Sequence, residues 1–357
     1  MKQWTLHGKR GIDSLVYDEN ALVPEVGDKG VLVRCTFSNL AVLLSLTEPV
    51  HAAALNYRDL VIATGRYPFP VKEGVVPASD GAGTVEAVGK HVHRFKPGNR
   101  VATLFNQDHY GGSLDARTIT LGVGGSIDGT LREYGVYDEQ GLVKIPDNLD
   151  LLEGSTLSCA ALTAWNALYG LESKALKQGD TVLTQGTGGV SLFALQFAKS
   201  AGAKVIATTS TAEKAEILKK LGADHVINYK EEPNWGEKVK SYTANNEGVD
   251  HIIEVSGPTT MKQSLAAVKI DGLITIIGFV GGMTNDQPSF LECLTHICTV
   301  RGVLVGSRVQ FEAMNRAIEV RNIKPVIDKQ VFTFDETKKA YRYMMDKKHF
   351  GKVCIKI

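Results

Sequence analysis

The feature that most constrains the fold is a glycine cluster between a predicted strand and a predicted helix. Thr181–Thr184 is rich in β-branched residues and leads into Gly186-Thr-Gly-Gly189, after which an amphipathic helical pattern begins. Glycines at such a junction permit the tight turn and let backbone N–H groups approach a pyrophosphate, which the helix dipole also favours. The sequence therefore predicts a dinucleotide site formed by Gly186, Thr187, Gly188, Gly189 and Val190.

Ser191 departs from the usual glycine pattern, because a third glycine normally stands at this position. A small side chain should still allow the helix to pack closely on the strand. The alternative interpretation is a tight strand-to-helix turn that binds no ligand.

The end of the second predicted strand, Lys204–Ser210, indicates which dinucleotide binds. NAD sites normally carry Asp or Glu here to hold the ribose 2′-hydroxyl, whereas this strand ends in Thr208-Thr-Ser-Thr211, with Lys214 one turn later. Hydroxyls and a cation suit a 2′-phosphate, so we expect Ser210 and Lys214 to bind NADPH. Ser210-Thr-Ala-Glu213 is also a capping-box pattern, and Lys214 alone could be an ordinary solvated residue.

Composition narrows the possible partners. The net charge of +1 comes from dispersed residues, which argues against a nucleic acid or an anionic membrane as partner, and no apolar run is long enough to span a bilayer. The first residues lack an apolar signal core, and five scattered cysteines without a Cys-x-x-Cys motif indicate a reducing compartment, so we expect a cytoplasmic protein. Cys293, His296 and Cys298 are too few to predict a metal site.

Hydrophobic patterning divides the 357 residues into about two domains. The first part has short apolar runs separated by Gly and Pro, whereas strand and helix patterns alternate from about Ser158. That alternation predicts a doubly wound parallel α/β sheet. Its expected strands are Thr181–Thr184, Lys204–Ser210, His225–Tyr229, His251–Val255 and Leu273–Phe279. After about Arg301, short strands such as Gly302–Val305 predict a return to the first domain.

A family resemblance extends over nearly the whole chain. It rests on Ala54-Leu-Asn-Tyr-Arg-Asp59, Gly65-Arg-Tyr-Pro68, Pro77-Ala-Ser-Asp-Gly-Ala-Gly83, Phe95-Lys-Pro-Gly-Asn-Arg-Val101, Cys159-Ala-Ala-Leu-Thr-Ala-Trp165 and Gly351-Lys-Val353. The chain resembles the medium-chain dehydrogenase/reductase superfamily, and within it the zinc-independent quinone reductases and 2-enoyl thioester reductases. The resemblance implies a GroES-like β-rich catalytic domain (1–157, completed by 301–357), a Rossmann domain (158–300), and an active site between them.

The same resemblance implies chemistry without zinc. Zinc alcohol dehydrogenases of this superfamily hold their metal with a Cys where this chain has Asn56 and a His where it has Ser79. The Glu after that His becomes Asp80, and only Cys159 lies near a ligand position. The Cys-rich loop of the structural zinc is also missing, so we expect no metal.

A zinc-free enzyme of this kind can add hydride to an activated C=C bond, provided that it supplies donors for the developing enolate and a proton. Tyr67 lies eleven residues after Asn56, and this spacing resembles that of the enoyl thioester reductases, where a tyrosine is the proposed proton donor. We expect Tyr67 to act in that role and Asn56 to orient substrate or nicotinamide. Tyr57 is the rival donor, and Tyr67 could simply pack beside its proline; Asp59 is expected to fix the loop.

Further cofactor positions come from the resemblance alone. Thr163 is expected near the nicotinamide ribose and Tyr229 near the adenosine phosphate, although both could be ordinary packing residues. Lys352 is expected to reach a cofactor phosphate or to form an exposed salt bridge. The nicotinamide side is expected to contact Gly278, Phe279, Val305, Gly306 and Ser307.

One segment does not fit the resemblance. Relatives have an unbroken second strand, whereas residues Cys35 to about Pro49 interrupt it here with an apolar, nearly uncharged stretch. We interpret it as an in-frame insertion, such as a retained intron.

The sequence thus favours an NADPH-dependent enoyl or quinone reductase. A zinc-type alcohol dehydrogenase and a non-catalytic NADPH-binding relative are the alternatives. The substrate would be a small enone, quinone or enoyl compound. We also expect a homodimer, paired through an edge strand supplied by the apolar segment Leu291 to Val305.

Overall fold

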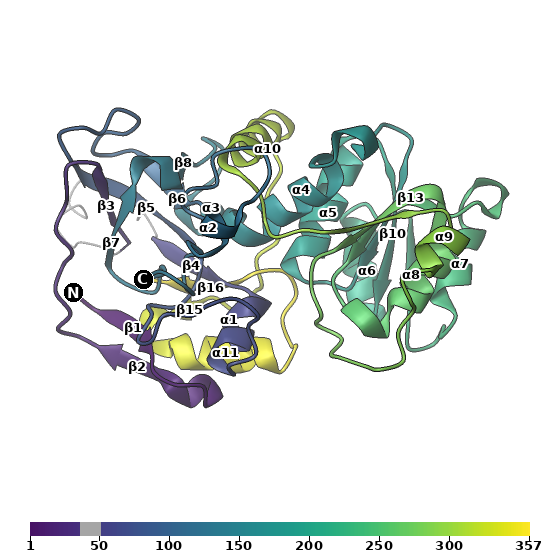
Figure 1. The fold of residues 1–357 in the computed structure, drawn as a ribbon, viewed down its shortest axis with the longest axis horizontal. Helices are drawn as coiled ribbons and strands as arrows, with labels where there is room; N and C mark the ends of the chain where they lie inside the picture. The colour runs from purple at the N-terminus through teal and green to yellow at the C-terminus, as the bar shows by residue number, and fades with distance from the viewer. Residues whose placement is uncertain (36–50) are drawn as a thin grey trace. The chain divides into compact units, whose positions relative to one another are not determined.

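The computed structural model describes residues 1–35 and 51–357, which form two compact units (Figure 1). The first unit contains Met1–Leu162 and Ser307–Ile357, and the second contains Thr163–Gly306. The predicted boundaries at 157 and 301 therefore lie a few residues early. The second shift has a clear cause, because the chain adds one more strand to the parallel sheet before it leaves the second unit.

The first unit is β-rich, as predicted. A small antiparallel sheet pairs β1 (Gln3–Leu6) with β2 (Leu15–Asp18), and a larger sheet holds the remaining strands. These are β3 (Gly30–Arg34), β4 (Ala52–Leu55), β5 (Asp80–Val88), β6 (Arg100–Thr103), β7 (Tyr134–Asp138), β8 (Leu142–Lys144), β15 (Phe332–Thr333) and β16 (Val353–Lys356). The helices are α1 (Tyr57–Ala63), α2 (Ala116–Ile119), α3 (Leu151–Gly154), α10 (Arg308–Arg321) and α11 (Thr337–Met345).

Alternating side chains explain how this unit forms its core. In β3, Val31 and Val33 are buried while their neighbours are half-buried, which is the period of two that a strand with one core face requires. The amphipathic helix α11 contributes Ala340, Tyr341 and Met344 to a buried hydrophobic cluster of this unit. The tail that follows α10 thus completes the first unit, as the sequence predicted.

The strands that flank the suspected insertion lie along the same edge of β5. Ala82 of β5 pairs with Ala52 of β4 on one side and with β6 on the other, and Thr84 pairs with Arg34 of β3 and again with β6. Only Gly83 separates these two β5 positions, so an unbroken strand would need one residue between Arg34 and Ala52, whereas the chain has seventeen, residues 35 to 51. Residues 36–50 lie outside the described part, but the register at both ends is the one that a sixteen-residue insertion into a single strand would leave.

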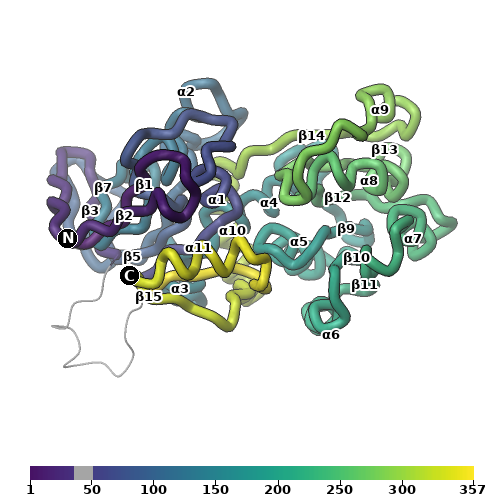
Figure 2. Tube along the Cα trace, turned by 90° about the horizontal axis from the view of Figure 1, so that it is seen from below, coloured from purple at the N-terminus to yellow at the C-terminus, as the bar shows by residue number. Residues whose placement is uncertain are grey.

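The second unit is a parallel sheet with the strand order β11-β10-β9-β12-β13-β14, which is the predicted doubly wound topology (Figures 1 and 2). Its strands are β9 (Thr181–Gln185), β10 (Lys204–Thr209), β11 (His225–Asn228), β12 (Val249–Glu254), β13 (Val268–Ile276) and β14 (Thr299–Gly302). Its helices are α4 (Leu162–Tyr169), α5 (Gly189–Ser200), α6 (Ala212–Lys220), α7 (Trp235–Ser241), α8 (Met261–Ala267) and α9 (Glu292–Thr295). Central strands such as β9 and β12 are buried on both faces, so the burial of their side chains does not alternate along the strand.

Two strand predictions need correction. The fifth parallel strand ends at Ile276, so Gly278 and Phe279 follow it instead of ending it. The next strand is β14 at Thr299–Gly302, and it pairs with β13 in the second unit, whereas Gly302–Val305 was expected in the first. Among the described residues, no helix is long and apolar enough to cross a membrane.

The register along β5 predicts that residues 36–51 can be deleted together. The shortened chain keeps Cys35 as the single residue between Arg34 and Ala52, and joining the two strands through one residue avoids the closure entropy of sixteen extra residues, roughly 2 kcal/mol. We expect a folded protein with an unchanged or higher free energy of unfolding, measured by chemical denaturation.

Deletion of residues 36–52 is the matched control for this prediction. One further missing residue moves every side chain of β4 to the opposite face, so this variant should be strongly destabilised. Equal stability of the two deletion variants, or failure of the 36–51 deletion to fold, would contradict a single interrupted strand.

Candidate functional site

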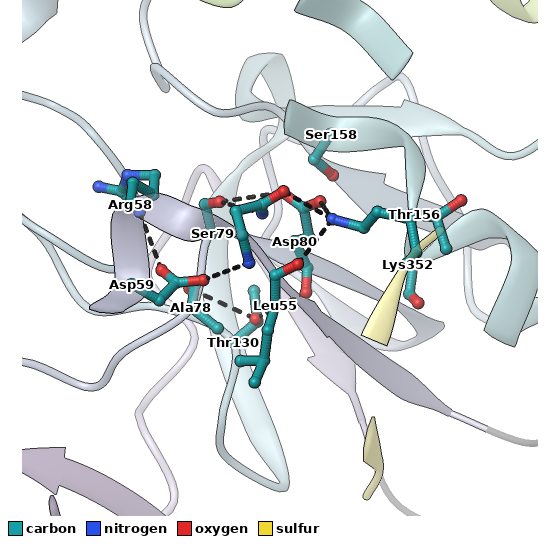
Figure 3. A network of polar contacts seen from close by, with 12 residues as sticks. Leu55, Arg58, Asp59, Ala78, Ser79, Asp80, Thr130, Thr156, Ser158 and Lys352 are labelled. Atoms are coloured by element: carbon teal, nitrogen blue, oxygen red, sulfur yellow. Dashed lines mark hydrogen bonds and ion pairs between the residues drawn. The ribbon is translucent and has the colours of Figure 1, made fainter. Parts of the chain in front are cut away.

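Three strand ends bring the candidate residues of the first unit together. β4 pairs antiparallel with both β16 and β5, with Leu55 opposite Val353 and Ala54 opposite Asp80. Asn56 directly follows β4, Lys352 directly precedes β16, and Asp80 begins β5. These three side chains therefore meet at one end of the sheet (Figure 3).

The ammonium group of Lys352 is the centre of this cluster. Its Nζ donates to the Leu55 carbonyl oxygen at 3.0 Å, to Oδ1 of Asn56 at 2.6 Å and to Oδ2 of Asp80 at 3.0 Å. The Lys352 side chain is 3% exposed and that of Asp80 is fully buried. A buried ammonium and a buried carboxylate need each other, because either charge alone would cost several kcal/mol in this setting.

These contacts change the role that the sequence assigned to Lys352. A lysine ammonium has three protons, and three protein acceptors lie within hydrogen-bond distance of it. The structure therefore gives Lys352 a salt bridge, but a buried one, whereas the alternative expectation was an exposed one. The predicted contact with a cofactor phosphate is not the function that its position supports.

The partners of Asn56 determine which way its amide faces. Lys352 can only donate, so the atom that faces it is the amide oxygen, and Nδ2 lies on the other side, 3.4 Å from Oγ of Ser79. Ser79 in turn donates to Oδ1 of Asp80 at 2.9 Å, and its carbonyl oxygen accepts from Thr103. Asn56 thus presents amide N–H groups with their direction fixed by a charged neighbour.

Asp59 fixes the start of α1, which is the structural role expected for it. Its Oδ2 accepts from the backbone N–H of Asn56 at 2.8 Å. Burial raises the pKa of Asp59 to about 6, against the opposing effect of the Arg58 cation. Because an unfolded Asp titrates near 4, this group favours the folded state most at low pH, and that contribution is lost as the pH rises from about 4 through 6.

Arg58 links α1 to Tyr67. Its guanidinium lies over the rings of Tyr67 and Phe105, at 5.0 and 4.6 Å from their centroids, and Nε donates to the Tyr67 hydroxyl at 3.4 Å. Its Nη1 is held by the Val123 carbonyl oxygen at 3.0 Å. Since Tyr67 accepts from a cation, its own phenol proton is left for another acceptor. Tyr57, the rival donor, packs with Tyr67 as a half-buried ring against the same core.

This donor set does not fit a catalytic zinc. The three relevant positions hold an amide (Asn56), a hydroxyl (Ser79) and the Cys159 thiol, whose pKa is raised to about 12 by burial and then by the Asp80 carboxylate. Zinc binds thiolates, neutral imidazoles and carboxylates, but the Asp80 carboxylate at this site is already paired with the Lys352 ammonium, which is also hydrogen-bonded to Asn56. No group of three or more His, Cys, Asp or Glu in the described chain could hold a metal ion.

In the second unit, the predicted glycine turn lies at the N-terminus of α5 and borders open space. Gly186 adopts φ +74°, and a Cβ built at Gly186 or Gly188 would meet no atom within 4 Å, so the turn borders open space. Gly188 is the N-cap of α5, a twelve-residue helix. Ser191 is buried, and its hydroxyl donates to the Gln185 carbonyl oxygen at 2.6 Å, which explains how it replaces the third glycine.

A buried carboxylate holds the end of the strand that leads into this turn. Glu254, at the end of β12, is fully buried and accepts from Gln185 at 2.7 Å and Ser264 at 2.5 Å through Oε2. Its Oε1 accepts from two backbone N–H groups and from Thr260. The network joins the carboxyl ends of β9 and β12, between which doubly wound folds bind their ligands.

The end of β10 carries the groups expected to select the dinucleotide. Thr209 is buried and its hydroxyl has no hydrogen-bond partner among the described residues, while its carbonyl oxygen accepts from the N–H of Tyr229. Ser210 follows Thr209 directly. The N-cap of α6 is Thr211, which accepts from the N–H of Lys214, so the capping-box interpretation of Ser210 is wrong by one residue. An unpartnered hydroxyl at this edge fits a phosphate or ribose ligand.

The residues predicted to contact the nicotinamide differ in how they are held. Gly278 and Phe279 lie on a loop that two backbone hydrogen bonds, from Val280 and Gly281, hold against the end of β12. Val305 is buried and its carbonyl oxygen accepts from Asn166 at 2.6 Å.

Two predicted hydroxyl contacts have structural uses of their own. Ser307, which follows Gly306, is the N-cap of α10, so its hydroxyl serves that helix. Thr163 is 3% exposed within α4, in keeping with the alternative of a core helix threonine.

Sequence reasoning missed two residues and one contact of these networks. Arg58 was passed over because it lies between Tyr57 and Asp59, which had drawn attention as possible donor and loop anchor. Glu254 gave a signal that could have been used, since this acidic residue directly follows the two apolar residues Ile252 and Ile253 of a parallel strand. The direct bond between Lys352 and Asn56 joins residues 296 positions apart and has no local signal.

Comparison with known proteins places the two units in known families. A family model for the alcohol dehydrogenase GroES-like domain matches residues 49–147, and one for a zinc-binding dehydrogenase matches 189–320. A zinc-type alcohol dehydrogenase-like protein of Schizosaccharomyces pombe is 46% identical over 309 residues, covering 86% of this chain and 89% of that protein. The quinone oxidoreductase of Pongo abelii is 30% identical and covers 79% of each chain.

Solved structures agree with this placement. A crystal structure from Sinorhizobium meliloti 1021, described as an alcohol dehydrogenase, has a TM-score of 0.86 and 38% identity, covering all of this chain and 98% of that one. A quinone oxidoreductase of Pseudomonas syringae has a TM-score of 0.80 at 25% identity, with 100% and 99% coverage.

The buried ion pair predicts a characteristic pattern of stability changes. Lys352→Met leaves the Asp80 carboxylate buried and uncompensated, which should lower the free energy of unfolding by roughly 3–5 kcal/mol. The double variant Lys352→Met/Asp80→Asn removes both charges and should recover a large part of that loss. Chemical denaturation of the single and double variants measures the coupling, and additive losses would show that the two charges do not stabilise each other.

Proposed function

Because the chain belongs to the medium-chain dehydrogenase/reductase superfamily of oxidoreductases, which use a nicotinamide cofactor, we propose that it is an NADPH-dependent reductase. Its proposed substrates carry an activated C=C bond or a quinone ring, and its proposed chemistry uses no zinc. The observation that carries the proposal is the Lys352 ammonium hydrogen-bonded to Asn56, at a site where zinc relatives have a metal ligand. The protein thus supplies a cation of its own at this position.

The reaction requires donors for the oxygen of the substrate. When bound, NADPH supplies a hydride to the β-carbon, and negative charge then develops on the conjugated oxygen. Asn56 can donate to that oxygen through Nδ2, while Lys352 polarises the amide from its oxygen side. Such preorganised donors stabilise developing charge most strongly where little water is present.

Tyr67 is the proposed proton donor to the α-carbon. Arg58 donates to its hydroxyl and lies over its ring, so the positive charge stabilises the phenolate that remains after proton transfer. Tyr57 is the second candidate for this step. Quinones depend less on such a donor, since water can protonate both of their reduced oxygens.

The name of the fission yeast relative keeps a zinc-type alcohol dehydrogenase as the second candidate. A non-catalytic NADPH-binding protein is the third. NADPH oxidation against a panel of quinones, enones, aldehydes and enoyl thioesters distinguishes the three. The proposal expects turnover of enones or quinones; turnover of aldehydes alone, or binding without turnover, would contradict it.

The first prediction that follows from the proposed function concerns the cofactor. Lys214→Ala should weaken NADPH binding by roughly 1–3 kcal/mol, since a charge-assisted bond to the 2′-phosphate is lost, and should leave NADH affinity nearly unchanged. Lys220→Ala, an exposed lysine on the same helix, is the matched control and should change neither affinity. Equal affinity of the unaltered protein for NADPH and NADH, measured by calorimetry, would overturn this assignment.

The second prediction concerns assembly. β14 is the end strand of the parallel sheet, and the chain before it exposes Phe290 (98%), Leu291 (70%), Leu294 (72%) and Ile297 (58%). We propose that two copies pair along β14 and cover this apolar face. Light scattering at micromolar concentration should therefore give a dimer, and Leu294→Glu should give a monomer. Val320→Glu, equally exposed on α10, is the control; a monomeric unaltered protein would refute the pairing.

The third prediction concerns the proton donor. Tyr67→Phe should lower kcat for an enone by roughly 10²–10⁴-fold with little change in NADPH affinity, and should affect quinones less. Tyr57→Phe is the matched control, with kcat near that of the unaltered enzyme. If Tyr67→Phe leaves kcat unchanged for an enone, the proton comes from Tyr57 or from water.

A further inference from the structure

Two cysteines that the reductase chemistry does not use lie on either side of one turn in the second unit. Cys293 belongs to the short helix α9, and Cys298 directly precedes the edge strand β14. From the sequence, these two cysteines and His296 are too few to predict a metal site. In the structure both thiols are reduced and half-buried.

The turn between them is a Schellman motif, and this motif explains why the two side chains meet. Ile297 adopts the left-handed conformation with φ +45°, and its N–H donates to the Leu294 carbonyl oxygen at 3.2 Å. The N–H of Cys298 donates to the carbonyl oxygen of Cys293 at 3.1 Å. In this motif, the residue whose carbonyl oxygen accepts the longer-range hydrogen bond and the residue whose N–H donates it also contact each other through their side chains. Cys293 and Cys298 occupy those two positions.

The thiols face the protein interior and interact with each other. Cys298 packs against the hydrophobic cluster of the parallel sheet. Burial raises the pKa of the Cys298 thiol, and the adjacent Cys293, to which it is hydrogen-bonded, raises it further. The exposed residues of this turn, Leu294 and Ile297, are apolar. Because the two thiols interact directly with each other, an intramolecular reaction is favoured over one with a second protein molecule.

We propose that Cys293 and Cys298 form a reversible intramolecular disulfide when the protein meets a peroxide. The Cys293 thiolate attacks the O–O bond, giving a sulfenic acid and one water after protonation. The Cys298 thiol then attacks that sulfur, so that the S–S bond forms and a second water leaves. The two sulfurs supply the two electrons that reduce the peroxide, and a dithiol reductant restores the thiols.

The disulfide would act as a covalent lock on the turn that leads into β14. A β-branched residue in the left-handed conformation is unfavourable, so Ile297 is held there only by the surrounding contacts. The N–H of Asp271 in β13 donates to the Ile297 carbonyl oxygen at 2.7 Å, which connects the turn to the sheet. Closing the Cys293–Cys298 ring would fix this geometry independently of cofactor or substrate.

The other cysteines provide internal controls. Cys35 and Cys354 are buried (3% and 0% exposed), and burial raises the pKa of each to about 12, as it does for Cys159. Protonated, buried thiols react slowly with peroxide. Oxidation should therefore concentrate on the Cys293–Cys298 pair.

The experiment is peptide mapping of the full-length protein after peroxide treatment. Trypsin releases Ile270–Arg301 as one peptide that holds both cysteines and no other, so the disulfide appears as a loss of two hydrogens within that peptide, reversed by a dithiol. In Cys298→Ala the sulfenic acid on Cys293 has no partner, and dimedone should trap about tenfold more adduct than in the unaltered protein, because an intramolecular thiol outcompetes the trap. Cys159→Ala should behave like the unaltered protein.

Three results would overturn the proposal: two titratable thiols in the treated peptide, equal dimedone adduct with and without Cys298, or a disulfide that links two chains. Cys293→Ala provides a second variant that should abolish both the mass loss and the adduct. None of these measurements depends on NADPH turnover, so their outcome stands apart from the proposed reductase activity.

Discussion

The buried pair of Lys352 and Asp80 is the interaction on which the candidate site depends. Neither charge is tolerable alone in that interior, so the start of β16 and the start of β5 must meet. Once they meet, the remaining ammonium protons orient the amide of Asn56 and bind the last carbonyl group of β4. The same residue thus aligns three strands and supplies a fixed positive charge beside a proposed substrate-binding amide.

The second unit also contains a buried carboxylate, but it is stabilised without a cation. Glu254 is fully buried, and its charge is balanced by five N–H and O–H donors instead of an ammonium. Those donors come from the ends of β9 and β12 and from α8, so the carboxylate fixes the edge that carries the glycine turn. Both units therefore place one buried charge next to the groups expected to contact ligand.

Much of this architecture could be predicted from sequence because its signals are local. The glycine turn and the β-branched strand before it lie within a dozen residues, and the strand after the turn carries no acid at its end. Strand ends were less certain, since Ile276 and Phe279 differ little in hydrophobicity and only hydrogen bonding decides where β13 stops. The partners of Lys352 could not be inferred, because chain topology alone brings residues 80 and 352 together. A surface interpretation of that lysine was reasonable until its burial was known.

The central claim is that a protein ammonium replaces the catalytic metal, and the metal dependence of turnover tests it most directly. Enone or quinone reduction by the purified protein should be unchanged after dialysis against a strong chelator, and elemental analysis should find far less than one zinc per chain. Loss of activity in the chelator, restored by added zinc, would contradict the account and return the protein to the zinc-type alcohol dehydrogenases.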